Sequence, residues 1–555
     1  MSFKLPIHYC KKKVGIFKNL YDDLELLEGV NGGMYQHLFN PKTSLGKNML
    51  SQWSEYYTTD IPFLKDSQKF YESLENEEVH VGCTEDMISI WKEIKNQKNF
   101  LEKYQYIDWE KIKWLNEYTP LMSFMSFYNL ASPALNLALP VIILLVPFFL
   151  LKIMGIPCTF QSYKKILLEQ IKNHSVGQLF TEFNKVEWDK RIYLVVSFGI
   201  YLFNIYQNFV SCYRFYYNIK NIDRYFTIIR QYVRYTIEKM DIVLKKIKNL
   251  KTYNPFAADV VLYKDKLLHF ESYFPRCNVF STAGIMKLGD IMKHFYLIYE
   301  KLDLDNMFTF SFGFNGFWDT IIGLSNNKYT SKATFKNKSL KFKNAYYPPL
   351  INNNPVKNDI SLKKNVIVTG PNAAGKTTIL KCTILNVLFT QQVGGGFYDK
   401  ATLMPFDYIH CYLNIPDTSG RDSLFQAEAR RCKKILSFME VYPNKKHFCI
   451  FDELYSGTNH YEAIGSAYSY LKYISKNKNV RFMLTTHFIQ LCELFDKEEN
   501  IKNMKMETTI IDNIPSYSYK IIKGVSKIKG GVCVLRQLKY PSNIIHLTEK
   551  TIRGL

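Results

Sequence analysis

The chain lacks several patterns that would assign it to a common class of protein. Its eleven cysteines are an odd number, and no two of them form a Cys-x-x-Cys pair. This spacing argues against a disulfide framework and against a zinc site, and it favours free thiols in a reducing compartment. No apolar run follows the charged residues 1–13, so no secretory signal peptide is expected. No long low-complexity tract is present either, and most of the chain is therefore expected to fold.

Length and charge indicate the number of domains and the kind of partner that the chain binds. At 555 residues the chain is longer than one hydrophobic core usually sustains, so about two to four domains are expected. Lysine and arginine outnumber aspartate and glutamate by 72 to 50, which gives a net charge of +22. Such a surplus favours contact with the phosphates of nucleic acid or with anionic lipid headgroups, and charge alone does not choose between them.

Two long stretches contain no charged residue. Residues 118–151 end in the run LALPVIILLVPFFLL, and residues 192–213 form a second run that is rich in tyrosine and asparagine. Each is long enough to cross a bilayer, which takes roughly 20 apolar residues. The alternative is a pair of buried core helices, which Pro140, Pro147 and the asparagines of both runs keep open. The flanking basic residues do not decide an orientation in a membrane.

A strongly basic stretch follows the second run. Residues 214–251 contain ten lysines and arginines against three acidic residues, at helical spacing. This pattern is typical of a face that binds nucleic acid or a membrane surface, and equally of a solvated helix face without a partner. After residue 345, short apolar runs alternate with helical segments, which indicates a parallel sheet with covering helices.

The most specific motif is VIVTGPNAAGKTT, in which an apolar strand runs into Gly370 and then Gly375, Lys376 and Thr377 open an apolar helix. This is the P-loop pattern in the strand, turn and helix context that it requires. Backbone N–H groups of such a loop surround the β-phosphate of a nucleotide, Lys376 supplies charge to the β- and γ-phosphates, and the Thr377 hydroxyl coordinates Mg²⁺. The predicted nucleotide-binding residues of this motif are Gly370, Pro371, Asn372, Ala373, Ala374, Gly375, Lys376, Thr377 and Thr378.

Two further apolar runs end in residues that suit hydrolysis. The run HFCIFDE ends in Asp452, placed to hold Mg²⁺ through water, and in Glu453, placed to orient or deprotonate the attacking water. The run FMLTTH ends in His487, which would contact the γ-phosphate or that water. A histidine after a strand is usually structural, but this one follows a P-loop and an acidic pair in the chain order of ABC-like ATPases. We predict Glu453, His487 and Lys376 as catalytic residues, with Thr377 and Asp452 at the metal.

Several of these segments resemble the MutS family of DNA mismatch-repair proteins. GPNAAGKTT is similar to the GPN-x-x-GKS/T of that family, and the glutamine segment 392–394 follows the first helix as it does there. DTSGRDSLFQAE at 417–428 resembles the signature segment of the family, and DELYSGTN at 452–459 resembles its DE-x-x-x-GT segment. The Thr-His pair at 486–487 and the closing segment 519–538 complete six motifs in the family's order.

The resemblance implies a nucleotide site shared between two chains. In the family two ATPase domains associate, and the signature serine of one approaches the nucleotide of the other, a role that falls on Ser423. The resemblance also adds Gln392 to the nucleotide-binding residues. It implies ATP and Mg²⁺ as cofactors, DNA as a partner bound through its backbone, and a dimer formed through the ATPase domains.

Outside the ATPase segment the resemblance is fainter and departs from the full-length repair proteins. Residues 38–68 and 310–324 are similar to the start and the return of the family's core helical domain. If the core begins near residue 38, too few residues precede it for the mismatch-recognition and connector domains, and little follows the last motif for a helix-turn-helix extension. A short form of the family is therefore expected.

We predict an α/β P-loop ATPase domain of the ABC-like type, with a mostly parallel sheet and flanking helices, after an all-α core interrupted by one or two hydrophobic, potentially transmembrane, helices. The predicted boundaries are an N-terminal extension at 1–37, a helical core segment at 38–117, a hydrophobic region at 118–213, a basic helical segment at 214–340 and the ATPase domain at 341–555.

The predicted function is ATP hydrolysis in paired composite sites that drives clamp-like closure on DNA, in DNA repair or recombination. The alternative is a membrane-associated ABC-like ATPase or scaffold that uses ATP as a conformational switch without mismatch recognition. An ABC transporter is disfavoured, since SGRDSLFQAE replaces the LSGGQ-type signature and only two runs are long enough to span. The expected location is a membrane, with the ATPase domain facing the cytosol or nucleus. The alternative is a soluble intracellular protein.

Overall fold

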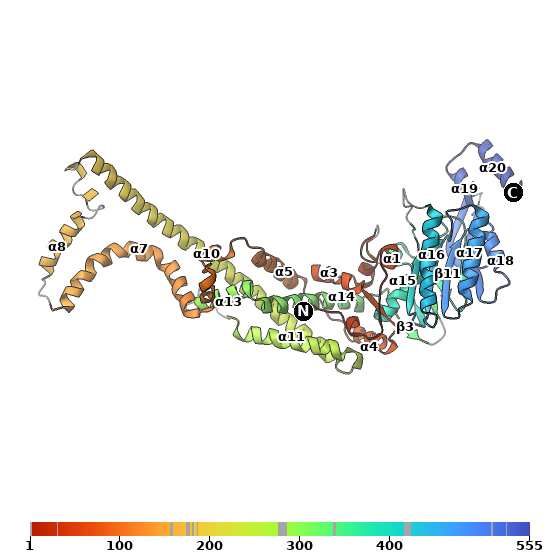
Figure 1. Cartoon of the computed structure of the whole chain (residues 1–555), viewed down its shortest axis with the longest axis horizontal. Helices are drawn as coiled ribbons and strands as arrows, with labels where there is room; N and C mark the ends of the chain where they lie inside the picture. Colours follow the sequence, from red (N-terminus) through yellow and green to blue (C-terminus); the bar gives the residue numbers. More distant parts are fainter. Residues whose placement is uncertain are drawn as a thin grey trace. The chain divides into compact units, whose positions relative to one another are not determined.

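The computed structural model describes residues 3–29, 32–155, 159–173, 178–179, 183–185, 187–275, 286–336, 340–413, 415, 423–511, 514–528 and 530–554. The chain forms two compact units, each assembled from segments that are far apart in the sequence (Figure 1). Unit 1 comprises Met1–Thr84, Thr236–Asp265 and Thr309–Leu555, and unit 2 comprises Glu85–Tyr235 and Lys266–Phe308.

A six-stranded sheet forms the centre of unit 1, with the strand order β13-β12-β6-β11-β10-β9. Strands β9 to β12 and β6 pair in parallel, and β13 closes the edge as the antiparallel partner of β12. The bounds are β6 (Asn365–Thr369), β9 (Tyr408–Tyr412), β10 (His447–Asp452), β11 (Val480–Thr486), β12 (Ile501–Ile511) and β13 (Ile514–Lys523).

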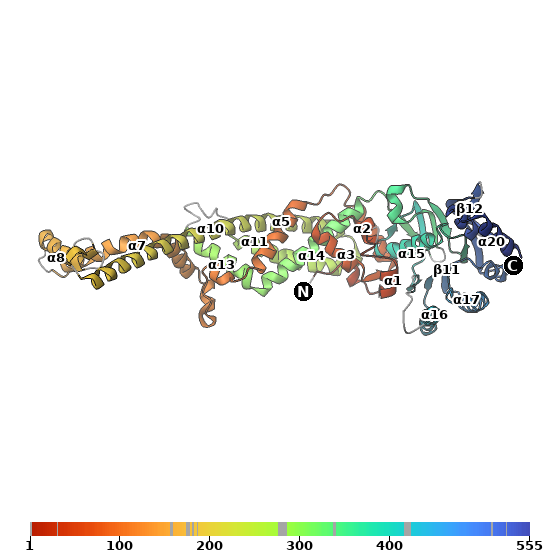
Figure 2. The same cartoon turned by 90° about the horizontal axis from the view of Figure 1, so that it is seen from above.

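Helices cover both faces of this sheet because neighbouring residues of a strand point to opposite sides. Phe482 and Leu484 of β11 join a buried core on the side of α16, α17 and α18. Met483 between them lies 3.6 Å from the Thr383 hydroxyl of α15, on the other side. Figure 2 shows α16 and α17 on one side of β11 and α15 apart from them. The bounds are α15 (Lys376–Val393), α16 (Leu424–Val441), α17 (His460–Ser475) and α18 (Ile489–Leu494), followed after β13 by α19 (Gly530–Gln537) and α20 (Ser542–Gly554).

A second, five-stranded sheet has the order β5-β4-β8-β3-β7 and packs near α15. Its strands are β3 (Ser331–Phe335), β4 (Lys341–Ala345), β5 (Asn358–Ser361), β7 (Gly395–Gly396) and β8 (Lys400–Leu403), with η5 (Pro348–Asn353) between β4 and β5. The mixed sheets with their helices agree with the predicted α/β class for this part of the chain.

The N-terminal segments fold into unit 1 beside these sheets. Their elements are η1 (Pro6–Tyr9), β1 (Lys13–Gly15), α1 (Lys18–Asp23), α2 (Met34–Phe39), α3 (Ser44–Trp53), β2 (Tyr56–Thr58) and α4 (Ile61–Glu72). Asp319 of α14 (Leu302–Ser325) anchors them, since its buried carboxylate accepts hydrogen bonds from the backbone N–H groups of Lys42 and Thr43 and from the Thr43 hydroxyl. Gly46 allows this approach, because a Cβ there would lie 2.1 Å from the carboxylate.

Unit 2 is helical. A buried aromatic cluster holds its centre, in which the Phe100 and Tyr299 rings stack with centroids 3.8 Å apart. Gly289 lets α13 approach α7, because a Cβ at that position would lie 2.2 Å from the Ser123 hydroxyl. The elements that lie wholly or partly in this unit are α5 (Val81–Lys95), α6 (Phe100–Lys103), η2 (Glu110–Glu117), α7 (Thr119–Ile153), α8 (Phe160–Asn173), η3 (Phe183–Lys185), α10 (Trp188–Ile247), α11 (Asn254–Tyr273) and α13 (Leu288–Glu300). Between α10 and α11, η4 (Lys251–Tyr253) lies in unit 1.

Both uncharged runs are helical: residues 118–151 coincide with α7, and residues 192–213 lie within α10. Among the described residues, α10 is long and apolar enough to cross a membrane, and 6% of its most apolar 18-residue window is buried. This window of α10 is therefore largely exposed within the described part of the chain. Length and composition alone are weak evidence for a membrane span.

The basic stretch 214–251 does not form a single uncompensated face. Arg224 pairs with Glu93, and Arg234 pairs with Glu271 at 2.7 Å. Lys239 is 7% exposed, and its ammonium lies 3.7 Å from the Glu77 carboxylate and 3.0 Å from the Glu238 carboxylate. Part of the predicted binding face is thus structural, and the exposed cations that remain near its end are Lys245, Lys246, Lys248 and Lys251.

Candidate functional site

The loop between β6 and α15 is shaped by its glycines. Gly375 adopts φ +90°, a conformation that favours glycine, and Ala373 before it also lies at positive φ. A Cβ at Gly375 would lie 3.3 Å from the Tyr519 ring, so the loop passes tightly beneath that side chain. The fully buried strand β6 fixes the start of the loop, and α15 begins directly after it at Lys376. Backbone N–H groups at the start of a helix are suited to an anion.

Lys376 lies folded back over this loop. Its ammonium donates to the carbonyl oxygens of Gly370 at 3.0 Å and Pro371 at 3.3 Å, and its side chain is 6% exposed. The same ammonium lies 3.6 Å from the Glu453 carboxylate. A buried cation held by neutral carbonyl groups is poised to accept a stronger, anionic partner.

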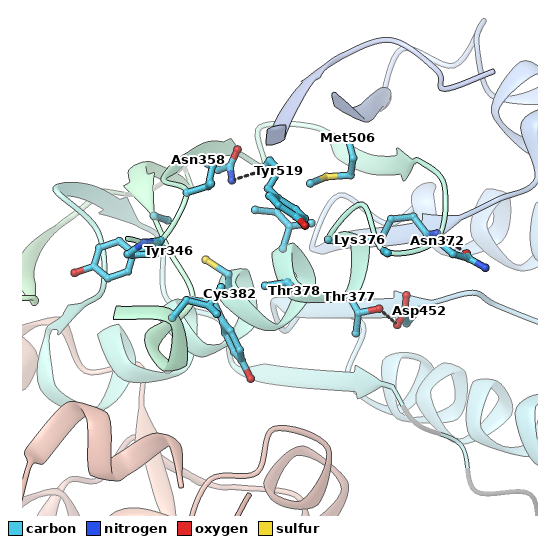
Figure 3. A pocket seen from close by; sticks show the side chains of 18 of the residues that line it. Tyr346, Asn358, Asn372, Lys376, Thr377, Thr378, Cys382, Asp452, Met506 and Tyr519 are labelled. Carbon is cyan, nitrogen blue, oxygen red and sulfur yellow. Dashed lines mark hydrogen bonds between the residues drawn. The ribbon is translucent and has the colours of Figure 1, made fainter. Parts of the chain in front are cut away.

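The metal-binding pair predicted from the sequence is in contact. The Thr377 hydroxyl donates to Asp452 Oδ2 at 2.7 Å (Figure 3). The Thr485 hydroxyl of the next strand donates to the other carboxylate oxygen. Asp452 ends β10 opposite Thr485 of β11, so the sheet register sets this contact. A hydroxyl and a carboxylate side by side supply the oxygen ligands that Mg²⁺ prefers.

Glu453 follows Asp452 in a strained conformation. Its φ of 49° is in the left-handed region, which turns its carboxylate toward both Lys376 and His487. The His487 Nδ1 atom lies 3.8 Å from that carboxylate. The neighbouring His487 and the Lys376 charge lower the pKa of Glu453, although burial opposes them. The carboxylate is therefore ionised at neutral pH.

Lys376 and Thr377 line one end of a cavity of about 930 Å³, whereas the predicted catalytic residue His487 is not among its lining residues. Seven of the nine residues from Gly370 to Thr378 line it, and Asp452 and Glu453 complete this end. Figure 3 shows Tyr519 and Met506 beside the loop, with Tyr346 and Cys382 farther from Asp452. The cavity thus combines a charged end with an aromatic and apolar end, as a ligand with a phosphate chain and a planar base would require.

A family model described as MutS domain V matches residues 366–555, which include the loop and all the groups above except Tyr346. Residues 366–555 are thus similar to this domain of the MutS family. The DNA mismatch repair protein MutS of Clostridium botulinum strain Hall is 29% identical over 203 residues, which cover 35% of this chain and 21% of the relative. The MutS protein of Bacteroides fragilis strain YCH46 is 28% identical over 207 residues, covering 36% and 23%. The match thus spans about a fifth of the length of these relatives.

The MutS-like signature segment is described only from Ser423 onward, because residues 416–422 lie outside the described part of the chain. Ser423 is exposed and caps α16: its hydroxyl accepts from the Gln426 N–H at 3.3 Å, and the Gln426 side chain accepts from the Ser423 N–H. It does not line the cavity. Within one chain Ser423 is a helix cap, and a nucleotide role would require a second chain.

The expectation that Gln392 binds the nucleotide needs correction. Gln392 lies near the end of α15, sixteen residues after Lys376, and it does not line the cavity. Its buried amide donates to the Tyr35 hydroxyl at 2.9 Å and to the carbonyl oxygens of Trp53 at 2.7 Å and Tyr56 at 2.9 Å. Gln392 lies in a segment that resembles the family's. Its hydrogen bonds, however, hold the N-terminal segments of unit 1 against α15.

Sequence reasoning gave no role to the residues at the aromatic end of the cavity. Tyr519 lies on β13 at φ 56°, and its carbonyl accepts from the Asn358 amide at 3.0 Å. Met506 of β12 lies beside it, with its Cβ 3.1 Å from the position that a Cβ on Gly370 would take. Tyr519 opens the segment that resembles the family's closing motif, which was the one available signal.

Proposed function

We propose that the cavity binds ATP with Mg²⁺ and that the chain hydrolyses it. The observation that carries this proposal is the convergence of the Lys376 ammonium, the Thr377–Asp452 pair and the Glu453 carboxylate at one end of the cavity. Their strands end at the carboxyl edge of a parallel sheet, where ligands bind in open α/β folds. Proteins of the MutS family are ATPases, which supports the proposal at the level of the family.

The binding step uses the loop, Lys376 and Thr377. The phosphate chain occupies the N-terminal end of α15, and Lys376 exchanges its contacts with Gly370 and Pro371 for the β- and γ-phosphates. Thr377 and Asp452 hold Mg²⁺, which when bound neutralises charge on the same phosphates. Gly375 is needed because a side chain there would push the loop against Tyr519.

The hydrolytic step falls to Glu453 and His487. Because the pKa of Glu453 is lowered, its carboxylate is available to accept a hydrogen bond from the attacking water. His487, whose Nδ1 atom lies 3.8 Å from that carboxylate, orients it and through it the attacking water. The aromatic end of the cavity receives the base, with the Tyr519 ring on one side of it.

The direct test compares Glu453→Gln with Glu440→Gln, the same change at an exposed position on α16. Glu453→Gln is expected to bind ATP with near-parental affinity and to lose hydrolysis by about 100-fold or more, since its role begins as the transition state forms. Glu440→Gln is expected to hydrolyse at the parental rate. Parental hydrolysis by Glu453→Gln would refute the assignment.

We further propose that two chains share each site, with Ser423 of one chain directed at the nucleotide of the other. Support comes from the exposure of Ser423 at the start of α16 and from the family, whose members act as dimers. Lys376→Ala and Ser423→Arg proteins, each inactive alone, should recover partial activity when mixed, because one site of the heterodimer is intact.

The matched control mixes Lys376→Ala with Glu453→Gln. These two changes fall on the same side of a shared site, so neither site of the heterodimer is intact and no activity should return. Failure of the first mixture to recover, with dimers confirmed by light scattering, would argue against shared sites.

We also propose that ATP binding closes the dimer on DNA, in repair or recombination. Family members bind DNA, and the exposed lysines near the end of the basic stretch offer contacts to backbone phosphates rather than to bases. Binding should therefore weaken steeply with salt and show little preference for mismatches. Lys245→Glu with Lys246→Glu should weaken binding, whereas Lys478→Glu on the exposed surface after α17 should not. A mismatch preference of about a hundredfold would contradict backbone binding.

A second candidate is a membrane-attached ATPase or scaffold in which ATP acts as a conformational switch on the cytosolic or nuclear side. One observation favours it: the apolar window of α10 is 6% buried. Extraction of membranes with alkaline carbonate tests the attachment, because an integral protein stays in the pellet. Complete release, with a monodisperse protein in the absence of detergent, would refute it.

A further inference from the structure

A large apolar surface in unit 2 has no covering partner within the described residues. It belongs to α7, α8 and the first part of α10, residues 188–213, which we call the apolar arm. Near unit 2's core the two helices are in contact, since the Cys212 thiol of α10 donates to the Leu130 carbonyl of α7 at 3.4 Å. In Figure 1, α7 and α10 then separate toward α8. Bulky side chains are exposed on both: Phe124, Phe127, Leu135, Leu137, Phe149 and Leu150 on α7, and Ile192, Val196, Ile200, Phe203, Tyr206 and Phe209 on α10.

The exposed side chains of α10 surround most of the helix. At about 3.6 residues per turn, the exposed positions between Ile192 and Tyr213 cover more than half of the circumference. Leu194 marks the narrow face that is covered. A helix that packs on one partner helix needs a single apolar stripe, so a second copy of the arm would leave much of this surface in water. A lipid bilayer would bury this apolar surface on most sides of the helix.

The same helix changes character abruptly beyond the arm. Phe215, Ile219, Ile222 and Phe226 are all buried, at 3% exposure or less, against other helices of unit 2. The exposure before this point is therefore a property of the arm and not of α10 as a whole. One helix passes from an apolar exposed segment into an ordinary protein core.

The length of the exposed segment matches a bilayer. Residues 192–213 contain 22 positions without charge, which in a helix extend about 33 Å, against roughly 30 Å for the hydrocarbon core. Aromatic and basic residues mark both ends: Trp188 with Arg191 stacked 4.9 Å from its ring at one end, and Tyr216, Tyr217 and Lys220 at the other. Tyrosine, tryptophan and basic side chains at the two ends are the usual anchors at membrane surfaces.

Helix α8 lies between the far ends of the two apolar helices. Tyr163 of α8 packs on Phe148 of α7 with ring centroids 4.8 Å apart. On the exposed side of α8, Lys164 and Lys165 present their charges to the surroundings. This arrangement suits a helix at a headgroup layer, with its aromatic side toward the hydrocarbon and its ammonium groups toward anionic lipid.

We propose that the apolar arm crosses a lipid bilayer twice, with α7 and α10 as the two spans and α8 at the far headgroup layer. This inference rests on the proposed membrane attachment and adds to it the number of crossings, the bounds of the α10 span and the side on which α8 lies.

Depth measurements test the crossing. Single cysteines replace Val195, Phe203 and Tyr213, three exposed positions, in a background whose reactive native cysteines are changed to serine, and each carries a nitroxide label. In vesicles of phosphatidylcholine and phosphatidylglycerol, oxygen should relax the Phe203 label most, and a water-soluble nickel chelate should relax it least, by about tenfold less than the other two. Equal depth at all three positions would show a helix lying flat at the surface, which refutes the crossing and leaves attachment intact. Access of the chelate to all three would refute both.

The side of α8 is tested with ascorbate, which reduces nitroxides but does not cross vesicles. A label at Lys478, on the ATPase side, identifies the vesicles with that side outward, in which it is reduced at once. In the same preparation a label at Lys165 should stay protected until the vesicles are permeabilised. Equal rates for the two labels would place α8 on the ATPase side and overturn the double crossing.

Discussion

The cavity of unit 1 and the apolar arm of unit 2 differ in whether their side chains have partners within the chain. In the cavity each charged group already has a partner within the chain: Lys376 holds two carbonyl groups, and Asp452 accepts from Thr377 and Thr485. In the arm, bulky apolar side chains such as Phe203 are exposed. The charged groups of the cavity are therefore paired before a ligand binds. The apolar side chains of the arm are not buried by the chain, so only a partner outside the chain can bury them.

The largest expected contrast is in stability. Phe482→Ala removes a fully buried ring from the core of β11 and should lower the free energy of unfolding by about 3 to 5 kcal/mol. Phe203→Ala removes a ring that is 58% exposed and should change it by less than about 0.5 kcal/mol. Urea denaturation in detergent measures both. A comparable loss at Phe203 would show that the arm has a protein core of its own.

The second contrast concerns nucleotide affinity. Lys376→Ala should weaken ATP binding by about 100-fold, because hydrogen bonds from a buried charge contribute up to about 3 kcal/mol. Lys164→Ala, which removes the same kind of charge from the arm, should leave the affinity unchanged. Fluorescence titration with a labelled nucleotide provides the values. An unchanged Kd for Lys376→Ala would remove the loop from the binding site.

A third prediction distinguishes a stabilising role of the far end of α15 from a role in nucleotide binding. Gln392→Leu leaves the Trp53 and Tyr56 carbonyl groups without their donor and should lower the free energy of unfolding by about 2 kcal/mol. The Kd for ATP should change by less than about twofold, since Gln392 does not line the cavity. Loss of ATP affinity without loss of stability would restore Gln392 to the nucleotide site and contradict the placement described above.

The smallest effect concerns pH. His410, packed against His447 with ring nitrogens 3.1 Å apart, has its pKa lowered from 6.5 to about 3 by burial and by the neighbouring charges of His447 and Arg431. The unfolded chain binds this proton first, so stability is complete above pH 6.5 and falls as the pH drops toward 3. His410→Leu should remove about 1 kcal/mol of the loss between pH 7.5 and 5.5.

The control for that measurement is His269→Leu, at an exposed histidine of α11. It should leave the pH dependence as it is in the parent. If His410→Leu also leaves the acid loss unchanged, then the buried pair binds a proton in the folded chain.

The sequence predicted the local elements of the site because strand, turn and helix signals agree there. The apolar runs that end at Thr369, Asp452 and Thr486 are strands β6, β10 and β11, and the family resemblance was confirmed by the domain V match. The position of Gln392 could not be predicted, because it depends on hydrogen bonds to Tyr35, Trp53 and Tyr56, more than 330 residues earlier. Tyr519 was missed for the same reason, since only the pairing of β12 with both β6 and β13 brings it to the loop.

Composition predicted the apolar helices of the arm but not their surroundings. The uncharged runs become α7 and part of α10, and an uncharged helix in a core has the same sequence pattern as one in lipid. The exposure of Ile192, Ile200 and Phe203 is tertiary information, because it depends on which other helices approach α10.

We propose above that the chain hydrolyses ATP and that DNA stimulates its turnover. The most direct measurement is the rate of Mg²⁺-dependent phosphate release with and without DNA. The parent should hydrolyse ATP, and duplex, mismatched and branched DNA should each stimulate it several-fold at low salt, with the stimulation lost as salt rises. Glu453→Gln should show no release under any of these conditions. A parental rate that is the same with every DNA and without it, or no Mg²⁺-dependent release at all, would contradict the account.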